Sequence, residues 1–286
     1  MRVLLTGASG FVGGYLAPAL VAAGHEVTAL VRDAGSYEAP DGVEPLEADL
    51  ESLGELPAAD AIAHLAQANV PFPDEAETLY RVNTISTLAL LDHARRSGAT
   101  RFVYASSASV YGFGERPFRE DDPAEFDNFY AVTKRNAERL VEAYGSFFGT
   151  SVLRLVAPYG PGQSGRMIPA VIGRVRDGQP VTLNGGGRPR MNPIYVEDAA
   201  RAFVAALELD GNHVVNVAGE DVVGIDDIAR LAGEALGREP VFEQGSADAP
   251  GDVVADTTRL HELLDLGETV AIDEGIRRTA NAEARA

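Results

Sequence analysis

The sequence contains no cysteine, one lysine and no long apolar run, and these features limit the kinds of site and partner that the protein can have. Without cysteine, disulfides, thiolate nucleophiles and thiolate metal sites are excluded. The five histidines show no ligand-like spacing, so we predict no metal site, and His64 lies in a strand-like run where we expect a hydrogen-bonded core histidine. No apolar segment approaches the ~20 residues that a membrane span needs, and no signal peptide precedes the first expected strand. We therefore expect a cytoplasmic protein.

Basic residues are also scarce relative to acidic ones. The 286 residues include 24 Lys or Arg against 43 Asp or Glu, which gives a formal net charge of −19. A surface this acidic repels phosphate backbones and anionic lipid, so we expect neither nucleic acid nor membrane as a partner. The hydrophobic share of 45% suits a folded protein with a large core.

The first 33 residues predict one βαβ unit with a glycine-rich turn. An apolar run at 3–5 predicts a strand, residues 15–23 keep apolar side chains in helical register, and 27–31 predict a second strand. Gly7, Gly10 and Gly13 fall in the turn between the first strand and the helix. Their lack of side chains lets a pyrophosphate approach the backbone, and the helix N-terminus offers free N–H groups to that anion. The unit predicts a dinucleotide site.

Strands and helices continue to alternate beyond this unit. We expect further strands at 43–48, 59–65, 101–105, 151–156, 194–196 and 213–217, and helices at 74–97, 129–148, 167–176, 198–209 and 226–236. Such alternation predicts an α/β fold of Rossmann type, a doubly wound parallel sheet. We assign residues 1–160 plus about 191–217 to this dinucleotide-binding domain, and about 161–190 plus 218–286 to a small C-terminal substrate lobe.

The only lysine lies in a pattern with chemical meaning. Tyr130 and Lys134 are four residues apart on an expected helix and therefore share one face. A phenol with a pKa near 10 is a poor base, but a nearby ammonium and a cationic nicotinamide ring favour the phenolate. Ser107, after the fifth strand, is placed to donate a hydrogen bond to the same substrate oxygen. These groups would transfer a proton while hydride moves to or from a nicotinamide.

In combination and order, these motifs resemble the extended short-chain dehydrogenase/reductases, the NAD-dependent epimerase/dehydratase family. The resemblance covers nearly the whole chain and rests on Thr6-Gly7-Ala8-Ser9-Gly10-Phe11-Val12-Gly13, Asp49-Leu50, His64-Leu65-Ala66, the segment from Ser106 to Gly112, Tyr130 to Lys134, and Tyr159-Gly160-Pro161. It implies catalytic roles for Ser107, Tyr130 and Lys134. It also implies a homodimer formed through the helices expected near 74–97 and 129–148.

The same resemblance implies a set of cofactor contacts. They are Gly7, Ser9, Gly10, Phe11, Val12, Gly13, Arg32, Asp49, Leu50, Leu65, Ala66, Gln67, Asn83, Tyr130 and Lys134. Asp49 and Leu50 would lie beside the adenine. Members that prefer NAD usually end the second strand with an acid, whereas this chain has Val31 followed by Arg32. Arg32 resembles the clamp for the 2′-phosphate of NADP, which favours NADP over NAD as the cofactor.

The candidate substrate contacts are Ser109, Arg166 and Arg190. Three positions depart from the nucleotide-sugar enzymes: Ala157 replaces an asparagine, and Met191 and Ala249 replace arginines. Either Arg166 and Arg190 substitute as anion clamps, or the substrate lacks a diphosphate. Ala108-Ser109 also replaces the acidic pair of 4,6-dehydratases, so dehydration is not expected.

We predict that the protein acts on a small molecule by reversible, NAD(P)-dependent hydride transfer. The reacting group is a secondary alcohol or ketone of a sugar, and a nucleotide sugar is the first candidate. A 4-ketoreductase or dehydrogenase fits this description. A nucleotide-sugar 4-epimerase with retained NAD and a reductase of a small non-nucleotide carbonyl stay open as alternatives. Outside this class, a non-catalytic dinucleotide sensor would need the glycine turn but not the Tyr/Lys pair.

Overall fold

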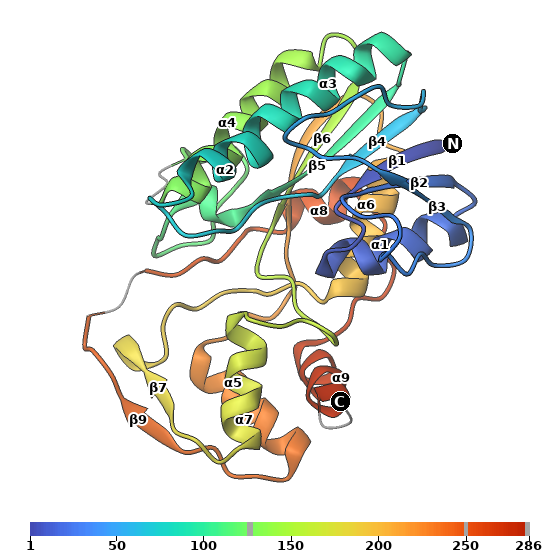
Figure 1. The fold of residues 1–286 in the computed structure, drawn as a ribbon. Helices are drawn as coiled ribbons and strands as arrows, with labels where there is room; N and C mark the ends of the chain where they lie inside the picture. The colour runs from blue at the N-terminus through green and yellow to red at the C-terminus, as the bar shows by residue number, and fades with distance from the viewer. Residues whose placement is uncertain (125–127, 249–250, 284–286) are drawn as a thin grey trace.

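A parallel sheet of seven strands organises the molecule (Figure 1). The computed structural model describes residues 1–124, 128–248 and 251–283. The sheet order is β3-β2-β1-β4-β5-β6-β8, and each neighbouring pair is parallel. The strands are β1 (Arg2–Thr6), β2 (Glu26–Val31), β3 (Val43–Glu47), β4 (Ala61–His64), β5 (Arg101–Ser107), β6 (Gly149–Leu155) and β8 (Asn212–Val217). The predicted Rossmann-type sheet is confirmed.

Helices cover both faces of this sheet (Figure 1). On one face, α1 (Phe11–Ala22) packs beside α6 (Val196–Ala206). The other face carries α2 (Ala76–Tyr80), a π-helical turn (Arg81–Ile85), α3 (Ser86–Ser97) and α4 (Phe129–Tyr144). The helix expected over 74–97 therefore forms, with a π turn inside it, and ends at Gly98 in the left-handed conformation (φ 76°). No helix of the described chain is long and apolar enough for a bilayer crossing.

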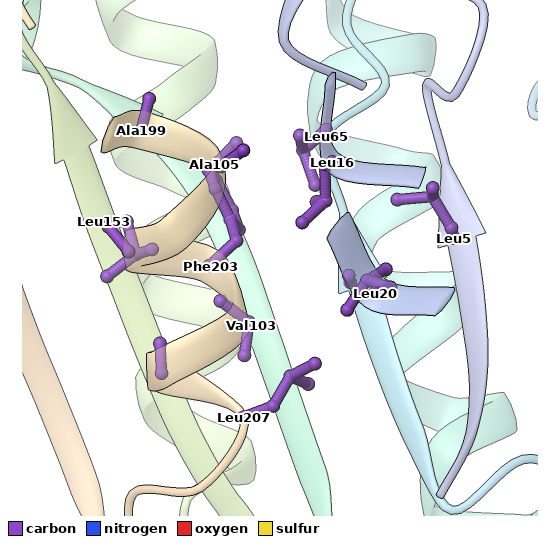
Figure 2. Close-up of a cluster of buried hydrophobic side chains, with 14 of the residues drawn as sticks. Leu5, Leu16, Leu20, Leu65, Val103, Ala105, Leu153, Ala199, Phe203 and Leu207 are labelled. Carbon is purple, nitrogen blue, oxygen red and sulfur yellow. The ribbon is translucent and has the colours of Figure 1, made fainter. Parts of the chain in front are cut away.

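Two apolar cores hold these layers together. Figure 2 shows the core that α1 and α6 share with the sheet, formed by Leu5, Leu16, Leu20, Leu65, Val103, Ala105, Leu153, Ala199, Phe203 and Leu207. Leu260, from α8 (Thr258–Leu263), belongs to the same core, so this helix packs on the sheet although the sequence division places it in the lobe. The second core, between the sheet and α3 and α4, includes Leu4, Ile62, Leu90, Phe102 and Val141.

The remaining elements form the lower body in Figure 1. They are α5 (Met167–Arg176), β7 (Val181–Leu183), α7 (Ile225–Leu236), β9 (Phe242–Gln244) and α9 (Ile272–Glu283). The helices α5, α7 and α9 meet in one core through Ile172, Ile228 and Ile276. The helix α9 lies in the C-terminal tail, where we predicted no helix.

The strand expected at 194–196 is wrong. Tyr195 makes a single bridge to Tyr159, and α6 already begins at Val196. Glu197 and Asp198 in the first turn complement the helix dipole, which favours a helix start here despite the apolar run.

Candidate active site

The glycine-rich turn connects β1 to α1 at the carboxyl edge of the sheet. Gly7 has φ 78°, and a Cβ there would lie 2.6 Å from the backbone nitrogen of Ala66. A Cβ on Gly13 would lie 1.9 Å from the carbonyl oxygen of Gly7, so α1 packs on the turn only without a side chain. Gly10 precedes α1, and no side chain caps its first turn. The turn thus offers free N–H groups to an anion, and the residues present fit a dinucleotide pyrophosphate.

The sheet order reverses between β1 and β4, and ligands of doubly wound sheets bind at such a point. Leu65, Ala66 and Gln67 follow β4 directly. His64 ends the strand, fully buried, with its ring nitrogens 2.7 Å from the Thr6 hydroxyl and 3.1 Å from the Thr87 hydroxyl. Burial lowers the pKa of His64 to about 3, so the ring is neutral. The prediction of a hydrogen-bonded core histidine is confirmed.

Other predicted cofactor residues surround the same edge. Arg32 follows β2, is exposed, and has no hydrogen bond or ion pair within the part of the chain that the structure describes. Asp49 follows β3 and accepts a hydrogen bond from the backbone of Glu51 at 2.9 Å, while Leu50 packs on the α3–α4 core. The remaining members of the set lie in the turn itself or in the start of α1: Ser9, Phe11 and Val12.

Asn83 lies inside the π-helical turn and uses its amide on protein groups. Its oxygen accepts from Ala68 N at 2.7 Å, and its nitrogen donates to Ala68 O and to Thr133 Oγ1. Because the side chain is buried, any effect on a cofactor must act through the segment that follows β4. The π turn directs both Asn83 and Thr84 toward α4, where Thr84 bonds the Thr133 carbonyl at 3.0 Å.

The three predicted catalytic residues come from two elements. Ser107 ends β5, whereas Tyr130 and Lys134 occupy the first two turns of α4. The Asn128 side chain caps this helix by accepting from Ala131 N at 2.9 Å. The Tyr130 hydroxyl donates to Gln67 Oε1 at 2.6 Å and interacts with the Ser107 hydroxyl. The structure thus brings Ser107 and Tyr130 together beside the segment that follows β4.

Burial perturbs the two predicted catalytic groups of α4, Tyr130 and Lys134. It raises the pKa of Tyr130 to about 12, and the Arg166 guanidinium and hydrogen bonds with Ser107 and Gln67 act in the opposite direction. Burial lowers the pKa of Lys134 to about 7, against the attraction of Glu138. The Lys134 ammonium donates to the Ala105 carbonyl oxygen at 2.6 Å and lies 4.6 Å from the Tyr104 ring centroid.

The two predicted substrate arginines have different surroundings. Arg166 precedes α5 in the lobe, and with the Asn69 carboxamide oxygen turned toward it, its two terminal nitrogens bond that oxygen at 2.8 and 2.5 Å. Arg190 instead donates to Val222 O and lies 3.3 Å from Asp227. Arg166 is close enough to Tyr130 for its charge to oppose the rise in the pKa of the phenol, whereas Arg190 is engaged within the lobe. Asn69 carries no sequence motif and was not expected here, and Ala249 lies outside the described residues.

A cavity of about 220 Å³ lies beside these groups. Ser107 and Ser109 line it, and the Ser109 hydroxyl is buried with no hydrogen-bond partner among the residues described. A substrate oxygen placed here would meet a serine hydroxyl and lie close to a phenol. This arrangement suits proton transfer at a carbonyl or alcohol oxygen.

Known proteins resemble this chain in sequence and in architecture. The model of the NAD dependent epimerase/dehydratase family matches residues 3–218. The UDP-glucuronate 4-epimerase of Thermodesulfobacterium geofontis is 29% identical over 81% of this chain and 75% of its own. The dTDP-4-dehydro-6-deoxy-D-allose reductase of Streptomyces bikiniensis is 29% identical over 97% of this chain and 94% of its own. The solved structure of MoeE5 in complex with UDP-glucuronic acid and NAD covers 100% of this chain and 99% of its own, at 28% identity and a TM-score of 0.88.

Proposed function

The chain belongs to the NAD-dependent epimerase/dehydratase family, and from that premise we propose that it catalyses reversible hydride transfer at a secondary alcohol or ketone of a nucleotide sugar. One observation supports the proposal above all: the Tyr130 phenol interacts with the Ser107 hydroxyl, and Ser107 lines a cavity of about 220 Å³. A 4-ketoreductase or dehydrogenase is the first form of this activity. A non-catalytic dinucleotide sensor would not require this contact between a phenol and a serine hydroxyl.

Tyr130 acts as the proton donor and acceptor in this proposal. With its pKa raised to about 12, the phenol is neutral near pH 7 and donates a proton to the oxygen of a ketone under reduction. Oxidation of an alcohol needs the phenolate, and Arg166 favours that form. Ser107 donates a hydrogen bond to the reacting oxygen and orients it. Lys134, one turn further along α4, adds positive charge only where it is protonated, below its pKa of about 7.

The turn at 7–13 would hold the pyrophosphate of the dinucleotide, with Asp49 and Leu50 near the adenine. A bound nicotinamide supplies or accepts the hydride. Arg166 is our proposed clamp for an anionic group of the substrate, because its charge acts on the catalytic phenol and its one hydrogen-bond partner among the described residues is a neutral amide. Arg190 would have to leave Asp227 to serve the same purpose.

The replacement Tyr130→Phe tests the proposal. We expect turnover to fall about 100- to 10,000-fold, because the proton donor is lost while the rest of the site stays in place. Cofactor affinity, measured by fluorescence titration, should change little. The matched control is Tyr144→Phe, at the far end of the same helix, which should keep full turnover. Unchanged turnover of Tyr130→Phe would contradict the mechanism.

A nucleotide-sugar 4-epimerase that retains NAD is the second candidate, since relatives with this activity match most of the chain. Arg32 favours the first candidate: an exposed, unengaged cation after β2 suits the 2′-phosphate of NADP, and an exchangeable NADP suits net redox chemistry. We expect freshly purified protein to release little dinucleotide on denaturation, and Arg32→Ala to raise the KM for NADPH more than for NADH. Near-stoichiometric NAD, identified by mass, would instead favour the epimerase.

We also infer a homodimer formed through α3 and α4, because exposed apolar side chains lie on α3 (Leu88), directly before it (Ile85) and just beyond α4 (Phe147). Cytoplasmic location and the lack of nucleic-acid or membrane partners stay predictions from composition.

A further inference from the structure

The cavity beside Ser107 has an apolar far wall. Besides the serines and Asn128, its lining consists of small or apolar residues, among them Phe113, Leu155, Val156, Ala157, Met191 and Val253. These residues come from the loop after β5, the end of β6, the segment before α6 and the segment before α8. The polar lining comes from the end of β5 and the start of α4, the same parts of the chain that carry the catalytic groups. The cavity therefore has a polar side and an apolar side.

Backbone pairing fixes the apolar side in place. Met191 exchanges two backbone hydrogen bonds with Val223, at 2.9 and 2.8 Å, and Val253 N donates to Arg190 O at 2.9 Å. Met191 is buried in a cluster with Ala108, Val156 and Ala218. The side chains facing the cavity thus belong to a packed layer, and no charged group of the described chain lines it.

Ala157 strengthens this conclusion. It is the only non-glycine residue of the described chain with a positive φ, 36°, a conformation that asparagine adopts more readily than alanine. Its neighbour Val156 is held on both sides by backbone bonds to Val217 and Ile194. The backbone keeps a bend suited to a polar side chain, whereas the side chain that lines the cavity is a methyl group. No amide is available to bond a substrate hydroxyl there.

We propose that this cavity selects a deoxygenated sugar, one that carries a methyl group where common hexoses carry a hydroxymethyl group and uronic acids a carboxylate. The inference rests on the proposed function and names its substrate class. The reacting oxygen meets Ser107, whose hydroxyl interacts with Tyr130, and a second oxygen meets the unpartnered Ser109 hydroxyl. The methyl group lies on Met191, Val253 and Ala157. A hydroxyl or carboxylate on this wall would lose its water without gaining a partner.

The experiment compares matched substrates in two nucleotide series: dTDP-glucose with dTDP-6-deoxyglucose, and UDP-glucose with UDP-6-deoxyglucose and UDP-glucuronate. Oxidation is followed at 340 nm with NAD and NADP, and epimers are detected by NMR. We expect kcat/KM to favour the 6-deoxy sugar about 10- to 100-fold in both series. Equal values, or a preference for the hydroxymethyl or carboxylate sugar, would overturn the proposal.

Two variants of one residue assign the preference to the wall. Met191→Gln introduces an amide of similar length and should reduce the ratio of kcat/KM for the 6-deoxy sugar to that for the hydroxymethyl sugar at least threefold. Met191→Leu keeps the wall apolar and should leave this ratio unchanged. Ala157→Asn, which suits the local φ, provides a second polar variant should Met191→Gln fold poorly. A preference that survives both polar variants would contradict the assignment.

Binding separates failure of this inference from failure of the proposed function. Calorimetry with Tyr130→Phe measures the affinity for the same sugars without turnover. Tighter binding of the 6-deoxy sugars, with no turnover by the unaltered protein, would support the selectivity and overturn the proposed hydride transfer. Equal binding together with measurable turnover would overturn the selectivity alone.

Discussion

Lys134 is an ammonium group enclosed by protein, with only 1% of its surface exposed. One hydrogen bond to Ala105 O and the face of the Tyr104 ring compensate part of its lost hydration. Burial nevertheless lowers its pKa to about 7. The side chain therefore loses its charge near neutral pH in the folded protein but only near pH 10 in the unfolded chain.

This difference predicts how stability depends on pH. Between pH 7 and pH 10 the unfolded chain binds more protons at this lysine than the folded protein does, so its contribution to the free energy of unfolding rises with pH, by at most about 1.4 kcal/mol per unit. Lys134→Met should remove this rise. Urea denaturation of both proteins at pH 6.5, 8 and 9.5 measures it as a difference that grows with pH. A constant difference across this range would contradict the lowered pKa, and Arg139→Met provides an exposed control on the same helix.

Some contacts of single residues could be predicted from the sequence, and others could not. The prediction that one helix carries both Tyr130 and Lys134 needed only helical periodicity, and α4 confirms it. The Tyr130–Gln67 and Arg166–Asn69 contacts join segments far apart in the chain. No local pattern encodes such pairs, because the sheet order and the docking of the lobe create them.

At the scale of elements, α4 is anchored to the sheet by one buried carboxylate. Glu138 accepts from Arg154 at 2.9 and 2.8 Å, from Ser106 at 2.5 Å and from Arg135 at 2.7 Å. Arg154 lies on β6, and Ser106 immediately precedes the predicted catalytic serine on β5. Because Lys134 lies one turn earlier, this network fixes α4 relative to Ser107.

Glu138→Gln should therefore destabilise the protein far more than a comparable surface change. Loss of the charge leaves Arg154 buried without its anion, which costs about 3 kcal/mol or more. The control is Glu142→Gln, one turn further along α4, where the ion pair with Arg139 is exposed and contributes at most about 1 kcal/mol. Urea unfolding of the two variants should differ by at least 2 kcal/mol. Equal stabilities would mean that the network does not anchor the helix.

The elements themselves were largely predictable, and the exceptions have physical causes. Apolar periodicity and glycine stops located the strands of the large sheet and most helices, including α5 at Met167–Arg176. Periodicity did not reveal the π turn at Arg81–Ile85, since one extra residue leaves the helix continuous. The segment at 194–196 is apolar because it is buried between the two bodies, and burial alone does not make a strand.

At the scale of the whole molecule, the site depends on contacts between the sheet domain and the lobe. The Tyr15 hydroxyl on α1 donates to Pro161 O at 2.9 Å, and Arg166 bonds Asn69 across the same boundary. Composition predicted neither contact. Loops at the carboxyl edge of the sheet meet the start of α5 there, so the substrate would bind between two bodies with separate cores.

Our last prediction concerns the outer surface around α3 and α4, which we expect to form a dimer contact. Ile85 and Leu88 are 46% and 38% exposed, and Phe147, just beyond α4, is 62% exposed. A single exposed apolar side chain is ordinary, but Ile85 in the π turn, Leu88 on α3 and Phe147 just beyond α4 together indicate a surface that another chain covers. A twofold axis would pair α3 and α4 with the same helices of a second copy, which buries this surface on both chains. We therefore expect a mass of about two chains by sedimentation.

Leu88→Glu should shift this mass toward a single chain, because each dimer would bury two carboxylates in an apolar contact. Val241→Glu is the matched control: Val241 is 50% exposed but lies in the lobe, beside β9, so this change should leave the mass unaltered. A net charge of −19 adds repulsion between two copies, so the dimer should persist better at 0.3 M salt than at 0.02 M. A single-chain mass for the unaltered protein at both salt concentrations would contradict the homodimer, and an equal effect of both glutamates would show that the contact lies elsewhere.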